Sequence, residues 1–242
     1  MSLHLIQCRP DPLALAAWAA RHGLLSPDGD YGYALHALLS AVFGASAPKP
    51  FRYLDARQGL LAYSDSDPVE LREHAALATP EAARALGADT LDARAFPTAW
   101  RSGQHLAFEV RVRPVVRTND GRERDAFLHA IGPVVEGAEA DPKNAPSRST
   151  VYSAWLHRQV TGDGAADLFH AELAGFCLTR VLRRPPNGAE GRRKALAISG
   201  PDALFKGELR IENGEAFARL VARGIGRHRA FGFGMLLLRP AC

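Results

Sequence analysis

The segment His105-Leu-Ala-Phe-Glu-Val-Arg-Val-Arg113 alternates between apolar and polar side chains along its length. The apolar side chains that fall on one face are Leu106, Phe108, Val110 and Val112. The polar side chains on the opposite face are His105, Glu109, Arg111 and Arg113. Because successive side chains of a β-strand point to opposite faces of its sheet, this alternation predicts a strand with one buried face.

The chain before this strand predicts a β-α-β-β-α-β unit that the strand completes. Its expected elements are a strand at Leu3–Cys8, helices at Asp11–Arg21 and Tyr33–Phe43, strands at Phe51–Asp55 and Leu60–Ser64, and a helix at Pro68–Ala78. In the second of these helices, apolar residues recur at the spacing of one helix face, and Gly44 stops the pattern. His105–Arg113 is then expected to be the fourth strand of this first unit.

The second half of the chain predicts the same order of elements. These are a strand at Arg124–His129, a helix at Ser149–Val160 capped by Ser149 or Thr150, strands at Leu173–Leu182 and Ala195–Ile211, a helix at Gly214–Arg223 and a strand at Phe233–Leu238. Two such units in series predict an α+β protein with tandem ferredoxin-like (RRM-like) domains, residues 1–118 and 119–242. The halves share too little sequence to be called a repeat, so this prediction rests on element order alone.

Composition excludes several classes of protein. With 242 residues, 47% hydrophobic and 23% charged, the chain is typical of a globular protein and unlike a disordered, collagenous or coiled-coil one. No apolar run approaches the roughly 18 residues of a membrane span, and the N-terminus lacks the features of a secretory signal. The three cysteines are widely separated and match no zinc-site spacing, so we expect reduced thiols in a cytoplasmic protein without a metal.

The whole excess of positive over negative charge lies in the second half of the chain. Residues 1–118 hold 12 basic and 12 acidic side chains, and residues 119–242 hold 18 and 14. One cluster, from Arg180 to Lys194, includes six basic residues against Glu190 alone, and after Glu215 there are five arginines and no acid. Such clusters favour a polyanionic partner, and the guanidinium group suits phosphate. A solvated face without a partner remains the alternative.

A glycine-rich segment, Gly224-Ile-Gly-Arg-His-Arg-Ala-Phe-Gly-Phe-Gly234, precedes the last predicted strand. It leaves a helix and enters a strand, the reverse of a dinucleotide-binding fingerprint, and it lacks the Gly-Lys-Ser/Thr ending of a P-loop. What the segment predicts is a loop that exposes its backbone and carries Arg227 and Arg229, where a phosphodiester could approach closely. The alternative is a plain turn.

His36 is the histidine whose position points to chemistry. On the helical wheel it lies about 100° from the centre of the apolar face, with Tyr33 and Ser40 beside it one turn away. A tyrosine and a histidine on one flank can act as acid and base, because the ordinary pKa of histidine is about 6.5. The alternative is a boundary histidine that only contacts solvent.

The Tyr33-Ala-Leu-His36 helix, the Gly224–Gly234 segment with its apolar close, and the run from Gly121 to Leu128 together resemble the CasE (Cse3) family of type I-E CRISPR systems. The resemblance covers nearly the full chain. It implies an endoribonuclease that binds the stem-loop of CRISPR repeat RNA and cuts at the 3′ base of the stem without metal or cofactor. The implied nucleophile is the ribose 2′-hydroxyl, which leaves a 2′,3′-cyclic phosphate, and the implied partners are crRNA and other Cascade subunits.

The resemblance also implies roles for individual residues. Catalysis falls to His36 and Tyr33. RNA binding falls to a basic hairpin and to the glycine-rich loop: Arg183, Arg184, Arg192, Arg193, Lys194, Arg227, Arg229, Gly224, Gly226, Gly232 and Gly234. Ala41 stands where some relatives carry a lysine that assists the phosphoryl group, so this cation must come from elsewhere.

Two other functions remain open. A non-catalytic RNA-binding subunit on the same fold would display aromatic residues on an exposed strand, of which Phe231-Gly-Phe233 is a faint version. An enzyme acting on small molecules would need a pocket motif, and we find none in the sequence.

Overall fold

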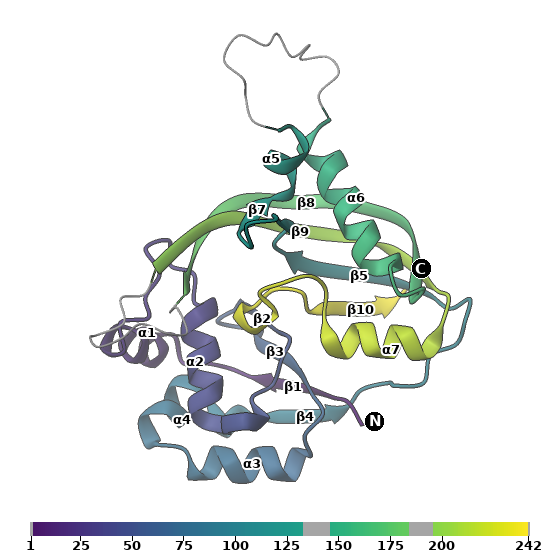
Figure 1. The fold of residues 1–242 in the computed structure, drawn as a ribbon. Coiled ribbons are helices and arrows are strands. Elements are labelled where there is room, and N and C mark those ends of the chain that lie inside the picture. Colours follow the sequence, from purple (N-terminus) through teal and green to yellow (C-terminus); the bar gives the residue numbers. More distant parts are fainter. Residues whose placement is uncertain (1, 133–145, 184–195, 242) are drawn as a thin grey trace.

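In the computed structural model, residues 2–132, 146–183 and 196–241 are described, and they form two α+β units that lie against each other (Figure 1). The first unit contains β1 (His4–Cys8), α1 (Pro12–Arg21), α2 (Gly32–Phe43), β2 (Phe51–Asp55), β3 (Gly59–Ser64), α3 (Pro68–Leu77), α4 (Pro80–Leu86) and β4 (Asp92–Ala95). Its antiparallel strands are ordered β2-β3-β1-β4, which is the ferredoxin-like arrangement.

The second unit repeats this arrangement. It contains β5 (His105–Val112), β6 (Val115–Arg117), β7 (Glu123–Asp125), α5 (Ala126–Ala130), α6 (Arg148–Thr161), β8 (Ala166–Arg183), β9 (Leu196–Ile211), α7 (Gly214–Arg223) and β10 (Leu236–Pro240). Its sheet is ordered β10-β5-β9-β8, while β6 and β7 form a separate hairpin. Short 3-10 turns, η1 (Gly44–Ser46), η2 (Ala88–Thr90) and η3 (Arg229–Phe231), complete the elements. The prediction of tandem ferredoxin-like domains is confirmed.

Three element assignments from the sequence are wrong. The strand at His105–Arg113 does not close the first unit, because β5 pairs with β9 and β10 in the second sheet. The first sheet is closed by β4, a four-residue, partly exposed edge strand whose sequence shows no alternation. Most of the strand expected at Arg124–His129 is helix α5, and α6 is capped by Ser147.

The strand pairing therefore changes sheet between Ala95 and His105. The division of the chain into domains at residue 118 stays a prediction. None of the helices in the described ranges has the length and apolar character needed to cross a membrane.

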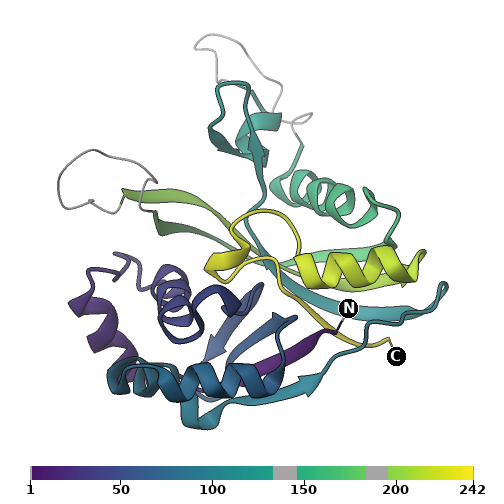
Figure 2. The same ribbon diagram turned by 60° about the horizontal axis from the view of Figure 1, so that its bottom comes forward.

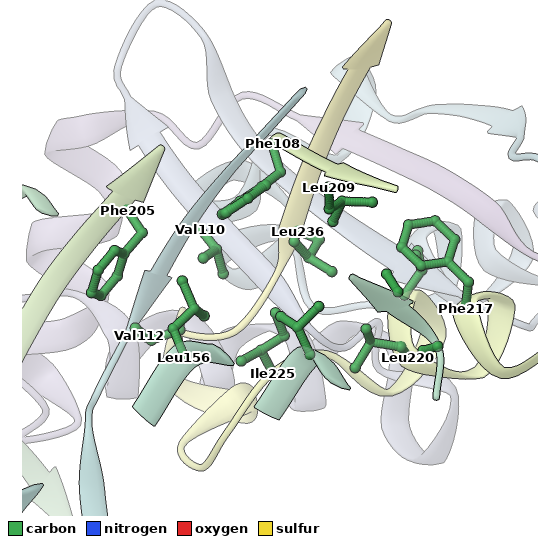
Figure 3. Packing of buried hydrophobic residues seen from close by; sticks show 14 of the residues in the cluster. Phe108, Val110, Val112, Leu156, Phe205, Leu209, Phe217, Leu220, Ile225 and Leu236 are labelled. Atoms are coloured by element: carbon green, nitrogen blue, oxygen red, sulfur yellow. The ribbon is translucent and has the colours of Figure 1, made fainter. Parts of the chain in front are cut away.

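The core of the second unit lies between its sheet and helices α6 and α7 (Figure 3). The apolar face of β5 contributes Phe108, Val110 and Val112, all at most 2% exposed. Helix α7 begins at Gly214 because the side chain of Asn213 accepts a hydrogen bond from the Ala216 N–H, and it presents Phe217 and Leu220 to the sheet. Burying one such side chain stabilises the fold by roughly 1.5–3 kcal/mol.

We expect Leu220→Ala to lower the free energy of unfolding by about 2–5 kcal/mol, because it removes a buried side chain and leaves a cavity. The matched control is Leu77→Ala in α3, where the leucine is 85% exposed, with an expected change within about 0.5 kcal/mol. Urea unfolding of both variants measures the difference. Equal losses would contradict this description of the core.

The two units are joined by ion pairs between arginines of the second sheet and aspartates of the loop that precedes α2. The Arg111 guanidinium group lies between Asp202 of β9 and Asp30, which precedes α2; its Nη2 is 2.9 Å from Asp30 Oδ2, and its Nε is 2.9 Å from Asp202 Oδ1. Burial opposes the charge of Arg111, but the hydrogen bonds and charges of Asp202 and Asp30 outweigh it and raise the pKa. A second ion pair holds the loop between α1 and α2, to which Asp30 also belongs: Arg180 Nη2 of β8 lies 2.6 Å from Asp28 Oδ1.

Candidate functional site

The glycine-rich loop of the second unit packs against helix α2 of the first (Figure 2). The Phe231 ring stacks on Tyr33, with ring centroids 5.6 Å apart, and meets the edge of His36 at 5.1 Å. Gly32 makes this contact possible, because a Cβ there would collide with the Phe231 carbonyl oxygen. Residues from opposite ends of the chain thus form one aromatic cluster, in which Tyr33 and His36 are 6.3 Å apart.

His36 lies in a setting that favours its neutral form. The side chain is half-buried, and this burial lowers its pKa; the positive charge of Lys49 lowers it further. A neutral imidazole at pH 7 is able to accept a proton. Ser40 lies beside His36 as expected, but its hydroxyl donates to the His36 carbonyl oxygen at 2.9 Å. This hydrogen bond is to the helix backbone and not to the imidazole.

A groove of about 890 Å³ runs between the two units beside this cluster. The first unit lines it with Leu3 and residues 45–49 and 63–66, and the second with Glu123 and residues 222–223 and 226–231. Its cationic side chains are Lys49, Arg223, Arg227 and Arg229, and its acidic ones are Asp65 and Glu123. The surplus of cations suits an anionic ligand. Within the described ranges no group of acidic, histidine and cysteine side chains is arranged to hold a metal ion.

The four glycines of the loop all have positive φ, between 71° and 84°. The loop closes on itself, because the Ile225 N–H donates to the Gly234 carbonyl at 2.8 Å. Its end is tied to β5, because the Gly234 N–H donates to the Arg111 carbonyl at 2.7 Å. A Cβ at Gly226 would lie 2.7 Å from the Trp155 ring, and one at Gly224 would lie 2.8 Å from the Gly234 carbonyl oxygen. Gly224, Gly226, Gly232 and Gly234 therefore shape the loop, while their part in RNA binding stays a prediction.

The two loop arginines line the groove but already have partners. Arg227 Nε lies 2.6 Å from Glu123 Oε1, and Arg229 Nη1 donates to the Arg223 carbonyl at 2.9 Å. The predicted contacts of these arginines with phosphates are untested.

The predicted basic hairpin falls largely outside the described residues. This applies to Arg184, Arg192, Arg193 and Lys194. Arg183 is the last residue of β8, where its backbone pairs with Leu196. The β8–β9 ribbon passes the loop between α1 and α2, where the Ser26 hydroxyl donates to the Arg180 carbonyl at 2.7 Å (Figure 1).

Sequence reasoning missed two residues of this site. Lys49 comes from a short Pro-Lys-Pro connection, and its backbone N–H donates to the Tyr63 carbonyl at 3.0 Å, which fixes it at the groove. Glu123, in β7, bridges Arg227 and His228. Both lie in segments without hydrophobic periodicity, so no local pattern marks them. The sequence singled out Phe231 only as part of the possible stacking strand Phe231-Gly-Phe233. Phe233 is fully buried, so Phe231-Gly-Phe233 is not an exposed stacking strand.

Gly32→Ala tests the contact between the loop and α2. Alanine favours a helix over glycine by about 1 kcal/mol, yet we expect this variant to be less stable than the wild type, because the new Cβ displaces Phe231. Ala41→Gly, at an exposed position of the same helix, measures how helix propensity alone changes the stability. Thermal unfolding gives both changes, and a stabilised Gly32→Ala protein would refute the close contact.

A family model described as CRISPR associated protein matches residues 3–240. Among solved structures, Thermus thermophilus Cse3 bound to an RNA representing a pre-cleavage complex has a TM-score of 0.66 at 19% identity, covering 99% of this chain and 100% of that one. A CRISPR endoribonuclease Cse3 bound to a 19 nt RNA gives 0.64 at 19% identity, with 99% and 100% coverage.

A chain of a CRISPR RNA-guided surveillance complex, in a pre-nicking state, gives a TM-score of 0.52 at 16% identity and covers both chains fully. At these identities the likeness shows a shared fold. None of the curated proteins compared with the chain matches it.

Proposed function

This chain belongs to the family of CRISPR-associated proteins, and on that premise we propose that it is an endoribonuclease of CRISPR repeat RNA. It binds the stem-loop of the repeat and cuts the precursor at the 3′ base of the stem. The observation that carries the proposal is that Tyr33 and His36 pack against Phe231, which lines a cationic groove between the units. A fold shared over the whole chain with structures of Cse3 bound to RNA supports it.

The proposed reaction is a metal-independent transesterification. Neutral His36 takes the proton of the ribose 2′-hydroxyl, and the 2′-oxygen forms a bond to the adjacent phosphorus. The bond from phosphorus to the 5′-oxygen breaks, and that oxygen takes the proton of the Tyr33 hydroxyl. The products are a 2′,3′-cyclic phosphate and a free 5′-hydroxyl. Exchange with water then returns a proton to Tyr33 and removes one from His36, so that no net proton is consumed.

Negative charge that develops on the phosphorane requires a nearby cation. Helix α2 has Ala41 where some relatives have lysine, and Lys49 lies near enough for its charge to act on His36. We assign this role to Lys49, with Arg229 of the loop as a further groove cation. After cleavage the protein stays on the crRNA and joins other Cascade subunits, as expected from its likeness to a chain of a surveillance complex.

The single-turnover cleavage rate of His36→Ala should be lower than that of the wild type by a factor of about 10²–10⁴, which is the usual contribution of a positioned acid–base group. Its RNA affinity should remain, because binding is carried by other residues. The assay uses a repeat hairpin in excess EDTA and a denaturing gel, with His157→Ala, exposed on α6, as control. Loss of affinity together with rate would make His36 structural, and a wild type that binds without cutting would favour the non-catalytic RNA-binding subunit.

The cleavage rate should rise with pH, with its midpoint below pH 6.5. The reason is that His36 must be neutral to act as base, and burial and Lys49 both lower its pKa. Lys49→Ala removes one of these effects, so the midpoint of the rise should move to higher pH while the plateau rate falls. Lys206→Ala, half exposed on β9, is the control. A profile that falls from pH 5 to pH 7, or an unmoved midpoint in Lys49→Ala, would exclude this role.

A further inference from the structure

Glu123 joins the β6–β7 hairpin to the glycine-rich loop through two short contacts. One carboxylate oxygen lies 2.6 Å from Arg227 Nε, and the other lies 2.6 Å from His228 Nε2. The pair with His228 is well buried, with side chains 16% and 10% exposed. The hydrogen bond from His228, helped by Arg227, lowers the pKa of Glu123 to about 2 although burial opposes it. A carboxylate only accepts hydrogen bonds, so Nε2 of His228 carries the hydrogen.

His228 in turn determines where Phe231 lies. It is the one non-glycine residue with positive φ (62°) among the described residues, a conformation that turns the chain into η3. Its carbonyl oxygen accepts a hydrogen bond from the Phe231 N–H at 2.8 Å, and the two rings are 6.0 Å apart. Phe231 is the ring that packs against Tyr33 and His36. A continuous series of contacts thus leads from Glu123 to His36.

We propose that Glu123 and His228 are positioning residues, which hold Phe231 in place and thereby set the orientation of His36 and Tyr33 for cleavage. This inference rests on the proposed function. It has a second consequence for the groove, because the carboxylate that orients His228 also neutralises Arg227. Glu123 therefore raises the cleavage rate while it weakens the attraction of the loop for RNA.

Glu123→Gln separates these two effects. Arg227 and His228 contact different oxygens of Glu123, and glutamine replaces one of these oxygens by an amide nitrogen that only donates, so in this geometry one of the two contacts is lost. We expect the single-turnover rate at saturating protein to fall by about tenfold to a hundredfold, the scale of a misplaced catalytic group. The Kd for the repeat hairpin should stay the same or decrease, because Arg227 is released. A folding defect would instead impair binding and cleavage together.

The matched control is Asp92→Asn, which removes a carboxylate from an exposed ion pair with Arg94 on β4 and should change neither quantity. Thermal unfolding of each variant establishes that the compared proteins are folded. A Glu123→Gln protein that cleaves within twofold of the wild-type rate would overturn the proposal. So would a parallel loss of rate and affinity.

Variants of His228 distinguish positioning from proton transfer. His228→Gln keeps a side-chain N–H for Glu123 but cannot titrate, so it should retain most of the cleavage rate. His228→Gly removes the side chain without strain at positive φ and should lose as much rate as Glu123→Gln. A glutamine variant as inactive as His36→Ala would make His228 a catalytic group and refute the positioning role. A glycine variant at the wild-type rate would also refute it.

A measurement without RNA keeps this inference separate from the proposed function. The imidazole signals of His36, followed by NMR against pH, should titrate below 6.5 in the wild type and closer to 6.5 in Glu123→Gln and His228→Gly. The expected shift arises because Phe231 no longer covers the ring. Unchanged His36 signals in both variants would overturn the positioning role. A wild type that cleaves no repeat hairpin would refute the proposed function, while the NMR result would still stand.

Discussion

The buried charge of Arg111 is the constraint on which the site depends. A guanidinium group in this position must be paired, and it draws Asp30 of the first unit onto the sheet of the second. Asp30 also accepts a hydrogen bond from the Gly32 N–H at 2.8 Å, at the start of α2, while the Arg111 carbonyl accepts one from Gly234. One residue of β5 therefore locates both the start of helix α2 and the end of the glycine-rich loop.

This arrangement explains why the groove is charged yet not uniformly cationic. Its arginines stand beside carboxylates or carbonyl groups that orient them, as Glu123 does for Arg227 and the Arg223 carbonyl does for Arg229. Lys49 is held through its backbone, which leaves its ammonium group exposed at the groove. Under the proposed function, orientation of the catalytic groups and attraction of RNA thus make opposite demands on the same side chains.

Local patterns predicted most elements, the tandem fold and the pair of Tyr33 and His36, because period, caps and glycines are properties of short segments. Alternation identified β5 as a strand but not its partners, which depend on contacts across about a hundred residues. β4 was missed because a short, exposed edge strand needs no apolar face. Lys49 and Glu123 act through distant neighbours, so no local pattern marks them, and the roles of Arg184, Arg192, Arg193 and Lys194 remain predictions.

The contact between Gly32 and Phe231 joins residues almost two hundred positions apart, and β10 follows it directly. During synthesis on the ribosome, α2 emerges long before the loop that covers it. A nascent chain therefore carries His36 without Phe231, and under the proposed function it has no competent nuclease site until the glycine-rich loop has been synthesised. Truncated products that end before Phe231 would be harmless to cellular transcripts for the same reason.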